Sequence, residues 1–255
     1  MRAAAVAAAV VLLSSCRVDT DIALRVNGNG SGTVSVTVTA DADVHKAVPT
    51  LKTDVRNDDL TAAGWRTIGP AETKDGGLTV TFTHGFDNPA QATALLAQVN
   101  DVRGPLKNLV LVRTGKDSDS LFTLTGSLEV NGGLQAFADD AAIKLLGGAP
   151  YENQVKASGL DLGKAVGVTF TAELPGKLVR TTGSPDGNVI TWRVPMDGTP
   201  TDVATSTNNV DIASNVARVM RWVVALLLAA WVLGALVLGF MVASRAPSRR
   251  RTPRL

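Results

Sequence analysis

Residues 33–39 read Thr-Val-Ser-Val-Thr-Val-Thr, and this alternation is the clearest structural signal in the chain. A period of two places the three valines on one face of a β-strand and the hydroxyl groups on the other. The stretch before it is also extended. Residues 27–32, which join the two runs, are rich in Asn and Gly, which tolerate positive φ, so we expect a tight hairpin over residues 23–40.

The same alternation of apolar residues occurs twice more along the chain. Threonines alternate with Leu78, Val80 and Phe82, and apolar residues fill every second position over 166–172. Such alternation is typical of antiparallel sheets with one solvated face. Further strands are expected near residues 109–113, 122–130, 178–181 and 189–194.

Three helical patterns follow pairs of expected strands. The first covers residues 48–64, and the third runs from about 134 to 146. The second is the clearest, because Asp87 or Asn88 can cap it and Pro89 suits its first turn. The predicted fold class is therefore α+β, an antiparallel sheet or a partly closed barrel with helices packed on one side. The sequence leaves the choice between sheet and barrel open.

The N-terminus has the pattern of a lipoprotein signal peptide. A positive start is followed by the apolar run 3–13 and by Leu13-Ser14-Ser15-Cys16, which matches a lipobox. We therefore predict a signal peptide over 1–15 and lipidation of Cys16. Cys16 is the chain's single cysteine, which excludes internal disulfides and metal sites built from several cysteines.

The C-terminal region has the pattern of a membrane anchor. Residues 222–243 contain no charge, and roughly 20 helical residues cross a bilayer core of about 30 Å. The arginines after residue 244 predict a cytoplasmic C-terminus. Ala230 and Gly234 have a spacing that permits weak helix–helix self-association, although Ala and Gly are simply abundant here.

These signals divide the chain into five parts and place it in the cell membrane as a single-pass protein with an extracytoplasmic domain. The parts are a signal peptide over 1–15, an exported α+β domain over 16–195 anchored at Cys16, a flexible stalk over 196–217, a transmembrane helix over 218–244 and a basic cytoplasmic tail over 245–255. The expected membrane contacts are the acyl chains on Cys16 and this helix. All 23 acidic residues lie between residues 17 and 217, so the basic pI reflects the two ends and gives no reason to expect a nucleic-acid partner.

Motifs that carry chemistry are lacking from the sequence. His45 and His84 are the two histidines, and neither has partners at a spacing that indicates a metal site or a catalytic base. Signatures of hydrolases, zinc proteases or nucleotide binding do not occur. We therefore predict no catalytic residues, no metal ligands, no cofactor and no enzymatic activity. Trp65 and Trp192 are expected to pack in the core.

A short stretch near residue 175 contributes to a resemblance to a known family. Residues 173–177 read Glu-Leu-Pro-Gly-Lys, and a strand ending in Thr191-Trp192 follows. With the lipobox, the Thr- and Val-rich domain and the arginine tail, the chain resembles the LppM-type lipoproteins of actinobacteria over nearly its whole length. The resemblance implies a cell-envelope protein with a compact α+β domain that recognises or handles envelope lipids or glycolipids. It brings no active-site residues.

The leading hypothesis for function is a membrane-anchored, noncatalytic envelope lipoprotein whose domain binds a lipid or glycolipid. A protein-interaction or scaffold module of the envelope is the alternative, and a hydrolase with scattered Ser and Asp residues is a third. A lipid pocket would be lined by the apolar faces of the strands and the second helix, although the same side chains can form a dry core. The candidate lining residues are Val36, Val38, Val80, Phe82, Leu95, Val99, Val168 and Phe170.

Overall fold

The computed structural model describes residues 17–55, 58–100, 104–116, 119–131, 165–210 and 212–244. The chain divides into two compact units, Met1–Val210 and Asp211–Leu255. Each unit is described by itself. The expected third helix, over 134–146, lies outside the described residues.

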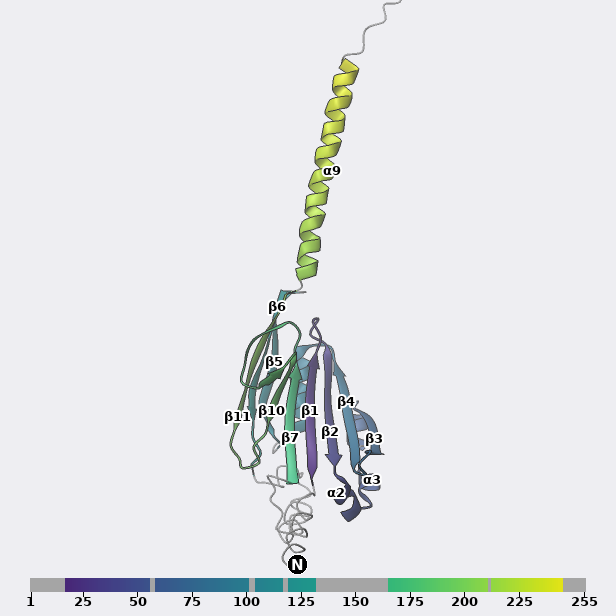
Figure 1. The fold of residues 1–255 in the computed structure, drawn as a ribbon, viewed down its shortest axis with the longest axis vertical. Coiled ribbons are helices and arrows are strands. Elements are labelled where there is room, and N and C mark those ends of the chain that lie inside the picture. Colours follow the sequence, from purple (N-terminus) through teal and green to yellow (C-terminus); the bar gives the residue numbers. More distant parts are fainter. Residues whose placement is uncertain are drawn as a thin grey trace, which may run out of the picture. The chain divides into compact units, whose positions relative to one another are not determined.

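Seven strands of the first unit form the larger sheet, in the order β3-β4-β2-β1-β7-β10-β9 (Figure 1). The strands are β1 (Val18–Val26), β2 (Gly32–Ala40), β3 (Arg66–Glu72), β4 (Leu78–Phe86), β7 (Val166–Glu173), β9 (Ser184–Asp186) and β10 (Val189–Arg193). The predicted β1–β2 hairpin is confirmed, with Leu24 opposite Val34. The pairing of β1 with β7 is parallel, with Ile22 opposite Phe170, which the alternation did not predict. It joins segments almost 150 residues apart into one sheet.

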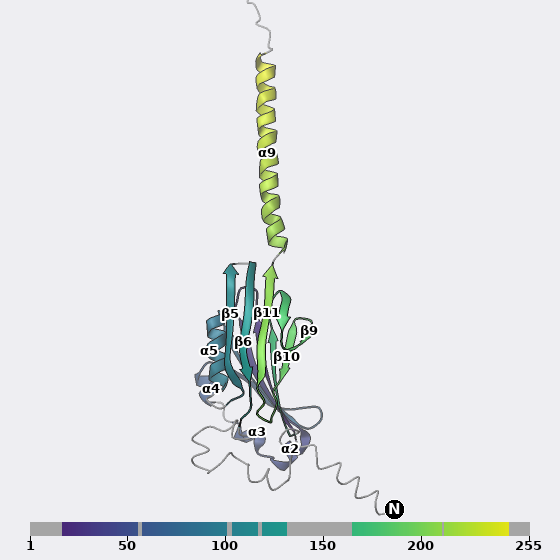
Figure 2. The same ribbon diagram turned by 90° about the vertical axis from the view of Figure 1, so that its left-hand side faces the viewer.

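Four strands form a second sheet, in the order β5-β6-β11-β8 (Figure 2). They are β5 (Leu106–Lys116), β6 (Asp119–Leu128), β8 (Lys177–Thr181) and β11 (Thr201–Val210). Residues 201–210, within the expected flexible stalk over 196–217, thus form β11, which is paired with β6 on one side and β8 on the other. Its inward side chains include Val203, Thr205 and Thr207, all buried. The mostly polar composition of this segment resembles that of a linker, but its pairing with a neighbouring strand on each side is that of a sheet strand.

Among the described residues of the first unit, the helices are short except for one. The region expected as a single helix over 48–64 holds α3 (Leu51–Asp54) and α4 (Asp58–Ala62), with α2 (Ala42–Ala47) just before it. The predicted second helix is confirmed as α5 (Pro89–Asn100). The Asn88 side chain caps it by accepting the Gln91 N–H at 3.0 Å.

The core lies on the valine-bearing face of the larger sheet. Phe170 and Leu24 from this sheet belong to the same buried cluster as Phe122 and Leu124 from the smaller sheet and Leu96 from α5. Trp65 and Trp192 also belong to it, which confirms their expected packing role. In Figure 2, α5 continues the layer of the smaller sheet beside β5.

The predicted fold class is therefore wrong. An α+β fold with one sheet, open or curved into a partly closed barrel, was expected, whereas the described residues form a mostly β structure with two separate sheets. The reason is physical: one face of the larger sheet needs an apolar cover. Among the described elements, strands β5, β6, β8 and β11 provide most of this cover, with helix α5 beside them.

Helix α9 (Ile212–Ser244) forms the described part of the second unit. Among the described residues, no helix combines the length and the apolar character required to cross a membrane. The transmembrane helix predicted over 218–244 is therefore not supported.

Candidate ligand-binding groove

A groove of about 410 Å³ lies between α5 and β5. Its volume falls within the range of roughly 300 to 1,000 Å³ that small-molecule sites occupy. The residues that line it come from one face of the helix and from the first half of the strand. They are Thr93, Leu96, Ala97, Asn100, Leu106, Lys107, Asn108, Leu109 and Val110.

Two side chains of α5 fix the helix to β5 at the ends of the groove. The Thr93 hydroxyl donates to the Pro89 carbonyl at 3.1 Å and accepts the Leu111 N–H at 3.0 Å. Seven residues further along, Asn100 Oδ1 accepts the Leu106 N–H at 2.5 Å. Seven residues of helix rise by about 10 Å. The groove is therefore held open between two polar attachments about that far apart.

A β-bulge shapes the strand side of the groove. The register between β5 and β6 shifts between Lys107 and Val110, and Asn108 has a φ of 51°. Gly126 lies against the bulge, and a Cβ at this glycine would come within 2.8 Å of the Asn108 carbonyl oxygen. Bulges re-aim side chains beside binding sites. Here the extra residue places Lys107, Asn108 and Leu109 all along the groove.

The groove combines an apolar floor with one cation. Leu96, Leu106 and Leu109 are almost fully buried and form the floor. Of the described lining residues, Lys107 alone is ionisable. Asn100 is the last residue of α5 and Asn108 lies in the bulge, and each adds a polar amide to the lining. Such a lining suits a molecule with an apolar body and an acidic or strongly polar head.

The lipid-binding residues predicted from sequence lie elsewhere. Val80, Leu95, Val168 and Phe170 are buried, whereas Val36, Phe82 and Val99 are partly buried against the core and Val38 is half-buried. None of the eight lines the α5–β5 groove, and Leu95 and Val99 belong to α5 but not to the groove lining. Whether any of them contacts a lipid stays a prediction.

Sequence reasoning missed Lys107, Asn108 and Leu109 because the bulge has no local signature. The glycine that accommodates it, Gly126, is in the neighbouring strand and has a φ of 149°. A glycine within an alternating strand is a recognised sign of a bulge or of close backbone approach. Gly126 was therefore the one available signal.

A second, more open pocket of about 590 Å³ lies beside the β1–β2 hairpin. Its lining is mainly polar, and it includes Arg25 and Asp87 as well as the backbone of two glycines, Gly32 and Gly85. Arg25 Nε is 2.6 Å from Glu173 Oε2, so the guanidinium already has an anionic partner. An amphiphile would find little apolar surface here.

Each of the two histidines contacts another residue of the fold. His45 Nδ1 lies 3.1 Å from the Gly76 carbonyl oxygen, and the His84 ring packs edge-on against Trp65 with centroids 5.4 Å apart. Within the described ranges, no three His, Cys, Asp or Glu side chains gather as they would around a metal ion. Cys16 lies outside the described residues, so its lipidation stays a prediction.

The fold and groove define the first unit as a two-layer, mostly β domain with a ligand-sized groove at a helix–sheet junction. No family model matches the chain, and no curated protein matches it. Among solved structures, it is similar to the NMR structure of the folded domain of Mycobacterium tuberculosis LppM, with 12% sequence identity and a TM-score of 0.40. The match covers 78% of this chain and 92% of that one. A likeness at this level carries no argument about function, and membership of the LppM-type family stays a prediction.

Proposed function

We propose that the chain is a noncatalytic cell-envelope lipoprotein, attached to a membrane through Cys16, whose β domain binds an amphiphile with an acidic headgroup in the α5–β5 groove. The observation that carries the ligand proposal is the leucine floor of the groove with Lys107 at its side. The lipobox at residues 13–16 supports the attachment.

The groove offers a contact for the apolar part and for the acidic part of such a ligand. A hydrocarbon chain that packs against the leucine floor is removed from water, which stabilises binding by about 25 cal/mol for each Å² of apolar surface buried. An acidic headgroup beside Lys107 forms a charge-assisted hydrogen bond, worth about 1.5 to 3 kcal/mol where water is partly excluded. A purely polar ligand would gain only the second contribution, and a neutral hydrocarbon only the first.

The test is the native mass of residues 17–210, which belong to one compact unit, purified gently and measured before and after organic extraction. We expect a discrete lipid-sized increment that extraction removes. A protein that stays bare when offered phosphatidylglycerol or a long-chain fatty acid would refute the ligand proposal.

A matched pair of variants locates the ligand. Ala94 and Ala97 are both exposed residues of α5, but of the two only Ala97 lines the groove. We expect Ala97→Phe to fill the groove and abolish the mass increment, and Ala94→Phe to leave it intact. Loss of the increment in both variants, or in neither, would place the ligand elsewhere.

An exposed apolar patch supports the alternative, a protein-interaction module. Val112 and Leu121 are 44% and 40% exposed, and they lie on the outer face of the smaller sheet, since Val112 pairs with Thr123 and Leu121 pairs with Thr114. Exposed patches of this kind can mark contact sites. If envelope crosslinking captures a partner that Val112→Asp and Leu121→Asp each eliminate, while residues 17–210 stay free of lipid, the interaction module becomes the better description.

A further inference from the structure

The first described residue of the domain, Arg17, is held firmly to the body of the fold. Its N–H donates to Asp41 Oδ2 at 2.7 Å, and its carbonyl oxygen accepts the Asp41 N–H at 2.9 Å. Its guanidinium forms an ion pair with Asp19 at 2.8 Å. Asp41 is itself fixed, because its other carboxylate oxygen caps α2 by accepting the Val44 N–H at 2.8 Å. Arg17 therefore has little freedom to act as a hinge.

Cys16 immediately precedes this residue. Consecutive Cα atoms of a trans peptide are about 3.8 Å apart, so acyl chains on Cys16 would start within a few ångströms of the folded surface. A flexible linker normally sets how far an anchored domain can move from a membrane. Here β1 begins at Val18, which leaves no room for one.

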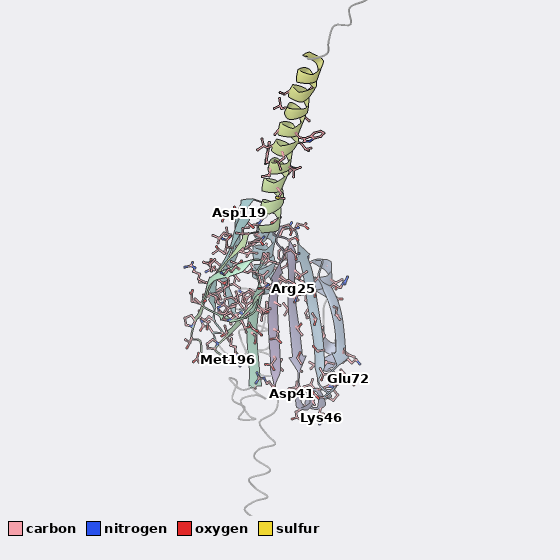
Figure 3. The ribbon with its side chains drawn as sticks, turned by 45° about the horizontal axis from the view of Figure 1, so that its top comes forward. Arg25, Asp41, Lys46, Glu72, Asp119 and Met196 are labelled. Atoms are coloured by element: carbon pink, nitrogen blue, oxygen red, sulfur yellow. The ribbon has the colours of Figure 1, made fainter. Side chains whose placement is uncertain are left out.

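The end of the domain that contains Arg17 is built by several elements, which we call the base: Arg17, α2, α3 and the turn between β3 and β4. His45 of α2 contacts that turn, with its Nδ1 3.1 Å from the Gly76 carbonyl oxygen. Lys52 of α3 forms an ion pair with Glu72 of β3, with Nζ 3.8 Å from Oε1. Figure 3 shows Asp41, Lys46 and Glu72 gathered at this end, with Asp119 at the other.

We propose that the base docks on the surface of the bilayer that holds the acyl chains of Cys16, so that the domain has a fixed orientation on the membrane. This inference rests on the proposed lipid anchor. The β1–β2 hairpin is at the opposite end of β1, and a strand of nine residues spans about 30 Å. Asn29 in the hairpin is therefore held about that far from the membrane.

Charge on the base does not drive this docking. The described lysines and arginines of the base are Arg17, Lys46, Lys52 and Lys74. The first three have anionic partners in Asp19, Asp43 and Glu72, and Asp75 directly follows Lys74 in the β3–β4 turn. A surface composed of such pairs gains little from anionic lipid, in contrast to a polybasic patch, which gains about 1 kcal/mol for each cation. The short connection to Cys16 sets the orientation, which should be the same on phosphatidylcholine with and without phosphatidylglycerol.

The test uses the full chain, acylated in cells and reconstituted in phosphatidylcholine vesicles, with nitroxide labels on Lys46→Cys or Asn29→Cys. Because acylated Cys16 has no free thiol and is the native chain's sole cysteine, each label reports on one position. A nickel chelate carried on a lipid headgroup relaxes nitroxides near the membrane. We expect relaxation at position 46 to be severalfold stronger than at position 29.

A matched variant with ten Gly and Ser residues inserted between Cys16 and Arg17 removes the constraint. Such a linker extends by about 17 Å on average, so the contrast between positions 46 and 29 should largely disappear. The intact mass of the chain shows whether Cys16 is acylated, and so separates the lipid-anchor hypothesis from the docking hypothesis. Equal relaxation at both positions in an acylated chain of native length would overturn the docking alone, whereas a chain without acyl groups on Cys16 would overturn the anchor and the docking together.

Discussion

Gly126 and Leu109 approach so closely that no side chain can stand between them: a Cβ added at Gly126 would lie 2.7 Å from Leu109 Cδ2 and 2.9 Å from Leu109 Cα. The φ of Gly126, 149°, is also one that residues with a side chain rarely adopt. We predict that Gly126→Ala lowers the free energy of unfolding by about 1 to 3 kcal/mol. Urea unfolding of residues 17–210 measures this change.

Gly85 provides the matched control. It lies in β4, and a Cβ at this position would meet nothing nearer than the Gly32 carbonyl oxygen at 3.8 Å. Gly85→Ala should therefore be neutral or stabilise by about 0.4 to 1 kcal/mol, because alanine restricts the unfolded chain. Equal destabilisation by the two substitutions would mean that the bulge does not depend on Gly126.

A second prediction concerns the headgroup that Lys107 selects. Lys107→Ala should weaken binding of a fatty acid or of phosphatidylglycerol by about tenfold, which corresponds to about 1.4 kcal/mol, and should leave binding of a neutral monoacylglycerol unchanged. Titration of residues 17–210 followed by tryptophan fluorescence or calorimetry provides the comparison. Lys177→Ala, in β8 and away from the groove, is the control. A uniform loss for acidic and neutral ligands would show that Lys107 acts through packing and not through charge.

A third prediction concerns the contact between the sheets at Thr182. This hydroxyl accepts the Trp192 Nε1–H at 3.1 Å and the Ala204 N–H at 3.0 Å, and it donates to the Asp202 carbonyl at 2.8 Å. Trp192 is 2% exposed, so its indole N–H has little access to water. Thr182→Val, which keeps the shape, should lower the free energy of unfolding by about 1 to 3 kcal/mol.

Thr182→Ser keeps the hydroxyl and should cost much less than the valine variant. Denaturant midpoints of both variants, measured under the same conditions, make the comparison. If serine destabilises as much as valine, the methyl group that serine lacks contributes as much to stability at this point as the hydroxyl group that valine lacks.

Local patterns predicted individual elements well. Alternation over residues 33–39 and 78–82 located β2 and β4, and Asn88 with Pro89 located the start of α5. These signals succeed because a period of two and a helix cap act over a few residues. They do not reveal which face is covered, or by what.

The parts that escaped prediction depend on contacts distant in sequence. The parallel pairing of β1 with β7 joins Ile22 to Phe170, and no local pattern encodes it. In β11, the buried Thr205 offers a hydroxyl where a core strand usually has an aliphatic group, and its Oγ1 donates to the Arg180 carbonyl at 3.1 Å. Such a strand resembles a polar linker until its neighbours are known. The groove depends on Gly126 in a neighbouring strand and was missed for the same reason.

The last prediction concerns the pH dependence of stability at Asp21, on the outer face of β1. Partial burial and the nearby charge of Asp19 raise the pKa of the Asp21 carboxyl above its ordinary value of 3.8, although a hydrogen bond from Thr169 opposes the shift. The folded state therefore binds more protons than the unfolded state from about pH 3.8 up to the raised pKa. The contribution of Asp21 to stability falls as the pH rises through that window and stays unfavourable above it.

Asp21→Asn removes this titration, so the variant should be more stable than the native chain at pH 7, and the difference should vanish as the pH falls below 3.8. Thr169→Val, which removes the hydrogen bond that favours the charged carboxylate, should raise the pKa further and steepen the loss of stability with rising pH. Urea midpoints at a series of pH values give both curves. A constant difference between Asp21→Asn and the native chain from pH 3 to pH 7 would show that the carboxyl of Asp21 has the same pKa in the folded and unfolded states.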